Sequence, residues 1–188
     1  EDLEVRGFTS GAKLDPDSCN IIVDQIKDYA PDLVLIVTPN AALPGASAAR
    51  EALAEVKLAT ITISDGPSKK AFIGKDDDGK KLIKVLDGQG FIILPSDPML
   101  GARREFLDPT EMSIFNGDVI KVLAATGVTR YIQLAIDKVV SDIKQGNAPE
   151  MPTLVADAET VVSQAGFSNP YAAAKAIAAL SIAETVAK

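Results

Sequence analysis

The amino-acid sequence contains no histidine among its 188 residues, and it contains a single cysteine, Cys19. The absence of histidine removes the commonest general base, the Ser-His and Cys-His nucleophile pairs, and most zinc chemistry. One cysteine cannot build an internal disulfide framework or a cysteine-rich zinc site. Any chemistry must therefore use carboxylate, lysine, tyrosine or arginine side chains, or belong to a bound cofactor.

The sequence also lacks an excess of positive charge and any long apolar run. The formal net charge is -7, whereas a nucleic-acid-binding domain needs a basic stripe. No apolar run approaches the roughly 20 residues that a membrane-spanning helix needs. Neither Gly-x-Gly-x-x-Gly nor Gly-x-x-x-x-Gly-Lys-Ser/Thr occurs, which argues against a conventional nicotinamide or P-loop site. We expect a cytoplasmic protein with no nucleic-acid or membrane partner.

Strand and helix patterns alternate in the first half of the chain. Three apolar runs have the length and the branched side chains of buried parallel strands: Leu33–Val37, Leu58–Ile63 and Phe91–Leu94. One helix is expected after the capping pair Asp15-Pro16, with Cys19 on its apolar stripe, and a second from Pro44 to about residue 56. This alternation predicts an α/β fold with a doubly wound, mostly parallel sheet.

After residue 108 the pattern becomes helical. Apolar residues recur at helical spacing on both sides of Thr126-Gly127, and the segment 145–149 ends the second of these helices. A short helix near residues 157–165 and an alanine-rich helix from about Pro170 follow. We therefore divide the chain into an α/β sheet domain over residues 1–108 and a helical bundle appendage, without further strands, over residues 109–188.

Two other segments have weaker patterns. Residues 3–8 alternate between apolar and polar side chains as a strand does. The segment 69–90 carries Asp76-Asp77-Asp78-Gly79, but it lacks the alternating oxygen ligands and the closing glutamate of a calcium loop. We predict a solvated turn there, followed by a short helix. The chain starts at Glu1 without methionine and ends at Lys188 within a helical pattern, so we expect a fragment of a longer protein.

Polar turn residues follow each of the three predicted central strands. Asn40 follows the first strand, Asp65 the second and Asp97 the third. The carboxyl ends of parallel strands meet at one edge of the sheet, where open α/β sheets bind their ligands. Each loop alone is explained by turn and cap formation. The three together favour a binding site at this edge.

The segment from Asp97 to Pro109 is rich in charged residues and lies between the predicted sheet and the predicted helices. Arg103 and Arg104 could bind the phosphates or carboxylates of a ligand, because guanidinium groups hold oxyanions through paired hydrogen bonds. They could equally pair with Glu105 and Asp108, or with a partner subunit. Asn116 fits a buried hydrogen-bonding residue at a helix interface. Gly45, at the start of a predicted helix, is a weaker candidate for holding a phosphate.

Several motifs resemble one archaeal protein family. They are Asp97-Pro-Met-Leu-Gly-Ala-Arg-Arg-Glu-Phe-Leu-Asp-Pro109, Glu111-Met112, Phe115-Asn116, Asp118-Val-Ile-Lys-Val-Leu-Ala-Ala-Thr-Gly127 and Gly166-Phe-Ser-Asn-Pro-Tyr-Ala172. The segments Ser10–Lys13 and Pro39–Gly45 fit the same family. It is the coenzyme F-420-dependent methylenetetrahydromethanopterin dehydrogenase family, and the resemblance covers essentially the whole chain.

The resemblance implies a function and an assembly. Members of the family reversibly transfer a hydride between coenzyme F-420, a 5-deazaflavin, and methenyl- or methylene-tetrahydromethanopterin, in methanogenesis or its reversal. Coenzyme F-420 is a dissociable co-substrate, and no metal or bound flavin is expected. A homo-oligomer, a hexamer built from dimers, is also implied. The family normally has a strand, a glycine-containing loop and a helix before the position of Glu1, and further sheet and helix beyond Lys188.

The resemblance also suggests roles for individual residues. Asp97 and Glu105 are candidates for stabilising the methenyl cation. The expected coenzyme contacts are Asn40, Pro44, Gly45, Ser64, Asp65, Gly66 and Arg103. The expected pterin contacts are Asp97, Pro98, Met99, Gly101, Arg104 and Asn116.

Two alternatives stay open on the residues alone. In the first, the chain is a non-catalytic α/β module in which Arg103 and Arg104 hold a small anionic molecule. In the second, these arginines and the helices of residues 109–145 mainly form an interface between subunits.

Overall fold

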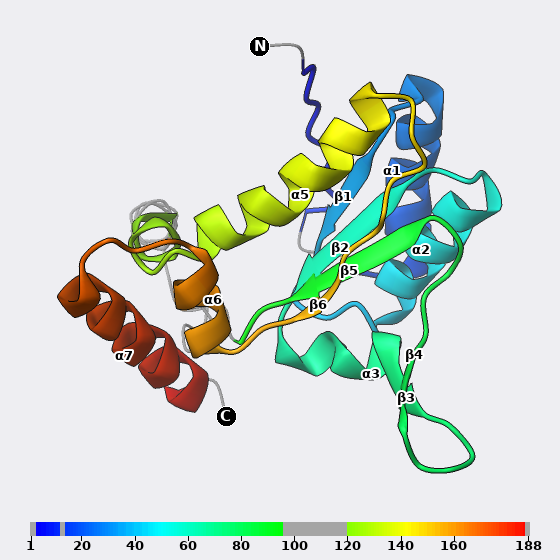
Figure 1. Cartoon of the computed structure of the whole chain (residues 1–188). Coiled ribbons are helices and arrows are strands. Elements are labelled where there is room, and N and C mark those ends of the chain that lie inside the picture. The colour runs from blue at the N-terminus through cyan, green and yellow to red at the C-terminus, as the bar shows by residue number, and fades with distance from the viewer. Residues whose placement is uncertain (1–2, 12–13, 96–119, 187–188) are drawn as a thin grey trace. The chain divides into compact units, whose positions relative to one another are not determined.

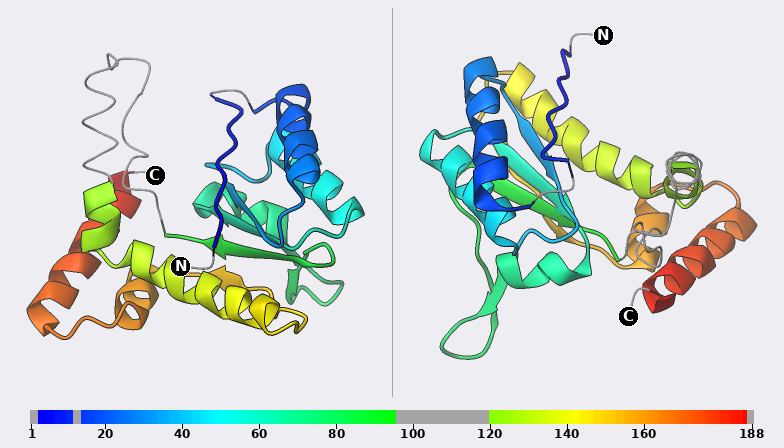
Figure 2. Two further views of the ribbon diagram at one scale, coloured as in Figure 1. Left: turned by 90° about the horizontal axis from the view of Figure 1, so that it is seen from above. Right: turned by 180° about the vertical axis from the view of Figure 1, so that it is seen from behind.

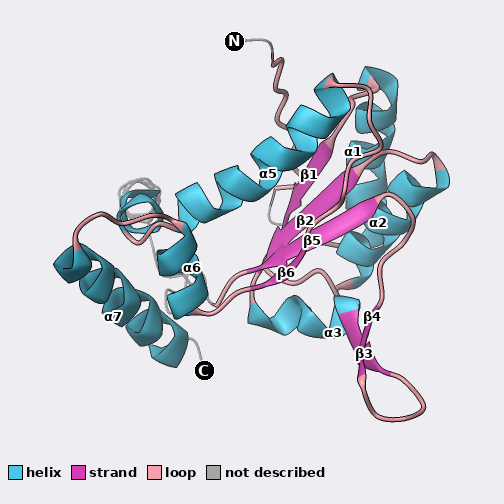
Figure 3. Cartoon of the chain, viewed as in Figure 1, coloured by secondary structure: helices cyan, strands magenta, loops and turns pink. Residues whose placement is uncertain are grey.

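The computed structural model describes residues 3–11, 14–95 and 120–186 (Figure 1). The chain forms two compact units, Glu1–Phe91 and Ile92–Lys188. A four-stranded sheet has the order β1-β2-β5-β6, in which β1 comprises Val34–Val37, β2 Thr60–Ser64, β5 Gln89–Ile93 and β6 Thr153–Val155. Helices lie between the strands in sequence (Figure 3). The predicted α/β class is confirmed.

Strands β1 and β2 form the parallel pair that the apolar runs predict. The register pairs Val34 with Thr60 and Val37 with Ile63. The third predicted strand is also present, as β5. Both β2 and β5 are buried along their whole length, as expected of strands covered on both faces.

Helices α1 (Pro16–Tyr29) and α2 (Pro44–Glu55) pack on one face of β1 and β2 (Figure 2). Helix α1 begins as predicted, because the Asp15 carboxylate accepts the Ser18 N–H at 2.9 Å and proline follows it. The core beneath the helices is formed by Val23, Val34 and Leu53. The parallel register places Thr60 on the same side as Val34, so alternate residues of β2 face the two helices.

The expected strand near the N-terminus is wrong. Residues 3–10 have no regular secondary structure, and Leu3 and Val5 are 61% and 85% exposed. The segment contacts the end of α1 instead, where the Arg6 guanidinium lies 4.4 Å from the centroid of the Tyr29 ring. Phe8 lies against the same ring, with centroids 6.3 Å apart. Alternation predicts a strand only where one face becomes buried, and here it does not.

The segment after β2 corrects a second expectation. A 3-10 turn (η1, Gly66–Ser68) and helix α3 (Lys69–Phe72) lead into an antiparallel hairpin of β3 (Ile73–Lys75) and β4 (Lys81–Ile83). The short helix expected after the aspartate-rich turn is absent, because β4 follows the turn directly. Each of these strands has three residues, which is too short for alternation to be recognised in the sequence.

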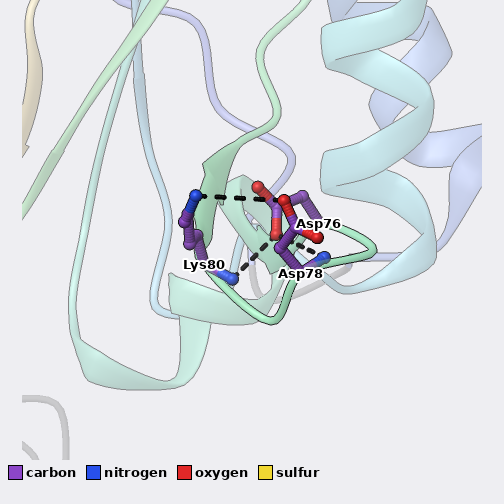
Figure 4. Close-up of polar contacts among 3 residues, drawn as sticks. All are labelled: Asp76, Asp78 and Lys80. Atoms are coloured by element: carbon purple, nitrogen blue, oxygen red, sulfur yellow. Dashed lines mark hydrogen bonds and ion pairs between the residues drawn. The ribbon is translucent and has the colours of Figure 1, made fainter.

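The aspartate-rich turn closes this hairpin through its own side chains (Figure 4). The Asp76 carboxylate accepts the N–H groups of Asp78 and Lys80, at 3.1 and 2.7 Å. Gly79 has a φ of +77°, the left-handed conformation that glycine adopts without strain. Within the described ranges no group of three or more acidic or cysteine side chains is arranged to hold a metal ion.

The second unit contains the helices that the sequence predicts beyond residue 119. Helix α5 (Val128–Lys144) begins after Gly127 and is followed by its C-cap Gln145, α6 spans Ala158–Gln164, and α7 spans Pro170–Val186. The presence of strand β6 shows that the prediction of a purely helical second half is wrong. Its neighbour Ala156 donates its N–H to the Ile93 carbonyl at 2.9 Å. None of the helices in the described parts of the chain combines the length and apolar content of a membrane span.

Candidate functional site

The candidate site lies within the first unit, where β1 and β2 end side by side. Thr38 follows β1 directly, and its N–H donates to the carbonyl of Ile63 at 3.2 Å. The loop that leads to α2 begins there, and the loop that contains Asp65 leaves the end of β2. Two of the three loops expected to converge are therefore adjacent. The third begins after Pro95 and lies outside the described residues.

A chain of buried hydroxyl groups joins these two loops. The Ser64 hydroxyl donates to the Thr38 carbonyl at 2.5 Å and lies 2.5 Å from the Ser68 hydroxyl. Because the Ser64 proton is directed at Thr38, Ser68 is the donor in the second bond. The Ser68 oxygen then accepts the Ala41 N–H at 2.7 Å. Ser68 and Ala41 are both fully buried, so the network fixes the two loops relative to each other.

Asn40 shapes the turn after β1. Its side-chain oxygen accepts the Ala42 N–H at 3.0 Å, and its carbonyl accepts the Leu43 N–H at 3.2 Å. This is the local turn-forming role that asparagine commonly plays. A ligand is therefore expected to contact the NH₂ group of the Asn40 side chain. Pro44, the next predicted contact, is the first residue of α2 and is exposed.

Asp65 brings a buried carboxylate to the same edge. It is 4% exposed, and its carbonyl accepts the Ser68 N–H at 3.0 Å. Burial of a carboxylate is costly, so acidic residues are rarely placed in such positions without a specific interaction. Gly66 follows in open space, since a Cβ atom built there would meet no atom within 4 Å. The hydrogen bonds from Ser64 to Thr38 and from Ala41 to Ser68 thus tie the loop that carries Asp65 and Gly66 to the loop that carries Asn40.

Gly45 occupies a different environment from the one expected. Its N–H donates to the carbonyl of Leu14 at 3.1 Å, and a Cβ built there would lie 2.7 Å from both the Asp15 carbonyl oxygen and the Cys19 sulfur. Glycine is therefore needed for the close approach of α2 to the start of α1. The Gly45 N–H is already engaged and is a poor phosphate donor. Cys19 is a buried core residue, and burial raises the pKa of its thiol.

Arg50 is a buried residue at this edge that the sequence reasoning missed. It is 7% exposed, and it donates to the Ala41 carbonyl at 3.2 Å. Helical spacing could have found it, because residues 46, 50 and 53 share one face of α2. Ala46 and Leu53 are buried on that face, so an arginine between them must be buried as well.

Many of the predicted contacts cannot be placed. The contacts that lie outside the described residues are Asp97, Pro98, Met99, Gly101, Arg103, Arg104, Glu105 and Asn116. Asp108 lies outside them as well.

Comparisons with known proteins identify the family. The family model for methylene-5,6,7,8-tetrahydromethanopterin dehydrogenase matches residues 1–188. An F-420-dependent methylenetetrahydromethanopterin dehydrogenase from Archaeoglobus fulgidus is 54% identical over 187 residues, which are 100% of this chain and 64% of the relative. The enzyme of the same name from Methanobrevibacter smithii is 46% identical over 185 residues, or 98% of this chain and 64% of the relative. The chain thus spans 64% of the length of these relatives.

A solved structure supports the same relationship. It is an F-420-dependent methylene-tetrahydromethanopterin dehydrogenase in complex with methylene-tetrahydromethanopterin and coenzyme F-420. It is 43% identical to this chain, with a TM-score of 0.75, and the match covers 93% of this chain and 61% of the solved one. The chain therefore belongs to the methylene-5,6,7,8-tetrahydromethanopterin dehydrogenase family.

Proposed function

We propose that this protein catalyses reversible hydride transfer between coenzyme F-420 and methenyl- or methylene-tetrahydromethanopterin. The observation that carries the proposal is the similarity, at 43% identity, to an enzyme whose structure contains both molecules. The absence of histidine agrees with it, because the hydride donor and the acceptor are both bound molecules. Coenzyme F-420 is a dissociable co-substrate in this proposal, with no metal and no bound flavin.

The carboxyl edge of β1 and β2 fits a polar part of the coenzyme. In the loop after β2, a Cβ built at Gly66 would meet no atom within 4 Å. At the end of β1, the buried hydroxyl oxygen of Thr38 makes no hydrogen bond to any described residue. We assign coenzyme contacts here to Asn40, Pro44, Ser64, Asp65 and Gly66. Gly45 stays in the proposal only as a neighbour of Pro44, because its N–H is engaged elsewhere. Arg103 is assigned to the anionic tail of the coenzyme, since guanidinium groups bind phosphates and carboxylates.

The chemistry requires positioning more than acid–base groups. When bound, the reduced coenzyme supplies a hydride from C5, and the cationic methenyl carbon of the pterin accepts the hydride and loses its charge. The protein has to hold the two carbons close together in a dry environment. Asp97 and Glu105 are proposed to stabilise the cation. Pro98, Met99, Gly101, Arg104 and Asn116 are proposed to hold the pterin.

We also propose that the protein works in the cytoplasm in archaeal methanogenesis or its reversal, as a homo-oligomer. The hexamer built from dimers that the resemblance implies is the expected assembly. Replacement of Arg103 and Arg104 tests whether these residues serve the ligand or the assembly. If they bind ligand, the double variant loses substrate affinity while its sedimentation stays unchanged. If they form a subunit interface, assembly changes first.

A spectroscopic assay of the native, full-length protein tests the proposed function. Methylenetetrahydromethanopterin and oxidised coenzyme F-420 are mixed with the protein, and the deazaflavin absorbance should be bleached as the coenzyme is reduced. Turnover with a nicotinamide cofactor instead would contradict the proposal. Tight binding of the coenzyme without bleaching would favour the non-catalytic anion-binding module.

A further inference from the structure

Arg50 has an environment that core packing alone does not explain. It lies on the buried face of α2 and is 7% exposed. Its guanidinium carbon lies 4.8 Å from the centroid of the Phe72 ring. Phe72 is itself stacked on Phe91, with centroids 4.6 Å apart. The charge therefore sits on an aromatic platform, where a cation is attracted to the face of the ring.

The hydrogen bonds of Arg50 are directed at neutral groups. Nη2 donates to the Ala41 carbonyl at 3.2 Å and to the Ser47 hydroxyl at 3.4 Å. Nε is buried and makes no hydrogen bond to any residue of the described ranges. Those ranges also place no carboxylate within ion-pair distance of Arg50. Burial lowers the pKa of this guanidinium, and the charge of Glu51 acts in the opposite direction.

Ala41 is held through both of its backbone groups. Its N–H donates to Ser68 and its carbonyl accepts from Arg50. Ala41 follows Asn40 in the loop between β1 and α2, so its fixation sets where the Asn40 side chain lies. A third hydrogen bond fixes the backbone of Arg50, because the Gln89 side chain donates to the Arg50 carbonyl at 2.5 Å. The loop is thus tied to α2, to η1 and, through α2, to the start of β5.

We propose that Arg50 is a positioning residue, which holds the β1–α2 loop in the shape that presents Asn40 to coenzyme F-420. This proposal rests on the proposed function. A buried apolar side chain would cost less than a buried cation that has no carboxylate partner among the described residues. Arginine offers what an apolar residue lacks, a planar group that can stack on Phe72 and donate sideways to a carbonyl at the same time.

The test compares Arg50→Met and Arg50→Lys with Arg130→Met, which changes an exposed arginine of α5. All are measured in the native, full-length protein. We expect Arg50→Met to raise the KM for coenzyme F-420 about tenfold, with the KM for the pterin and kcat changed less than about threefold. Arg50→Lys keeps a cationic hydrogen-bond donor at this position and should raise the KM for the coenzyme by a smaller factor. Arg130→Met should match the wild type.

Two further readouts separate a positioning role from a structural one. The melting temperature of Arg50→Met should stay close to that of the wild type, because loss of the hydrogen bond to Ala41 is offset by removal of a buried charge. Hydrogen exchange at residues 41–43 without ligand should become faster in both Arg50 variants. If Arg50→Met does not fold, Arg50→Lys decides the question through the same KM comparison.

The failure of this proposal differs from the failure of the proposed function. An active wild type with an unchanged coenzyme KM in both Arg50 variants overturns the positioning role. A fall in melting temperature that is accompanied by equal changes in both KM values and kcat also overturns it. A wild type that does not reduce the coenzyme at all overturns the proposed function itself.

Discussion

Gly45 and Gly66 were both expected to contact the coenzyme, yet their surroundings are opposite. Gly45, in the first turn of α2, is buried against the start of α1, and a Cβ there would lie within 2.7 Å of the carbonyl oxygens of Leu14 and Asp15 and of the Cys19 sulfur. Gly66 has no atom within 4 Å of such a Cβ, and its φ is not in the left-handed region. At the residue scale, Gly45 therefore allows close packing of the two helices, whereas Gly66 leaves space for a ligand.

These surroundings predict opposite effects of the same substitution. Gly45→Ala should lower the free energy of unfolding by about 1–3 kcal/mol, because the helices have to separate to admit the methyl group. Gly66→Ala should change it by less than about 0.5 kcal/mol. Urea denaturation measures both values. If Gly66 lies against the coenzyme as proposed, Gly66→Ala should weaken coenzyme binding while stability is unchanged, and unaltered binding would remove Gly66 from the proposed site.

At the scale of elements, the start of α5 depends on a single glycine. Gly127 caps the helix with a φ of +82°. A Cβ there would lie 2.5 Å from the Ala165 Cβ, at the end of α6, and 2.9 Å from the ring of Phe167. The position thus combines a left-handed backbone with close packing, and both requirements exclude larger residues.

Gly146, just after the end of α5, separates these two requirements. Its φ is +72°, but nothing lies within 4 Å of a built Cβ. Gly146→Ala should therefore cost only the backbone strain, about 1 kcal/mol. Gly127→Ala should cost at least about 2 kcal/mol, because strain and overpacking add. Thermal or urea unfolding checks the order, and equal losses would show that packing at Gly127 contributes nothing.

The elements that the sequence predicted are those with strong local signals. The cap and proline before α1 and the apolar runs of β1, β2 and β5 each specify their element locally. The hairpin β3–β4 and strand β6 were missed because each of their strands has three residues. A strand this short is decided by its neighbours in space, and a single sequence does not reveal them.

The candidate site was predicted in part for similar reasons. Turn residues after β1 and β2 pointed to the edge where these two strands end side by side, because parallel strands bring their carboxyl ends together. Arg50 and Ser68 were missed, since their importance comes from contacts across 9 and 27 residues of sequence. The third loop, which carries the most specific motif, lies outside the described residues.

At the scale of the whole molecule, two exposed carboxylates of the second unit make interactions that depend on pH. Glu150 forms an ion pair with Lys138, which lowers the pKa of Glu150 and raises that of Lys138. Asp157 caps α6 and accepts the Thr160 N–H at 2.7 Å, which lowers the pKa of Asp157. Both carboxyl groups therefore bind protons less readily in the folded chain than in the unfolded one.

The direction of these shifts predicts how stability depends on pH. Each carboxylate stabilises the fold fully above its unfolded pKa of about 4, and this contribution is lost as the pH falls through the lower pKa of the folded state. The variant Glu150→Gln with Asp157→Asn keeps the size of both side chains, and asparagine still caps a helix. Its melting temperature should be below that of the wild type at pH 7, and the difference should vanish near pH 2. A difference that stays constant with pH would contradict the assignment.

The two hydrogen bonds that hold the backbone of Ala41 affect the thermodynamics of ligand binding. Ordering a backbone residue costs about 1–2 kcal/mol in conformational entropy at room temperature. In the loop after β1 that cost is met during folding, by Ser68 and Arg50. A ligand that binds against residues 40–42 meets a surface that is already rigid, so its affinity is reduced little by loop ordering.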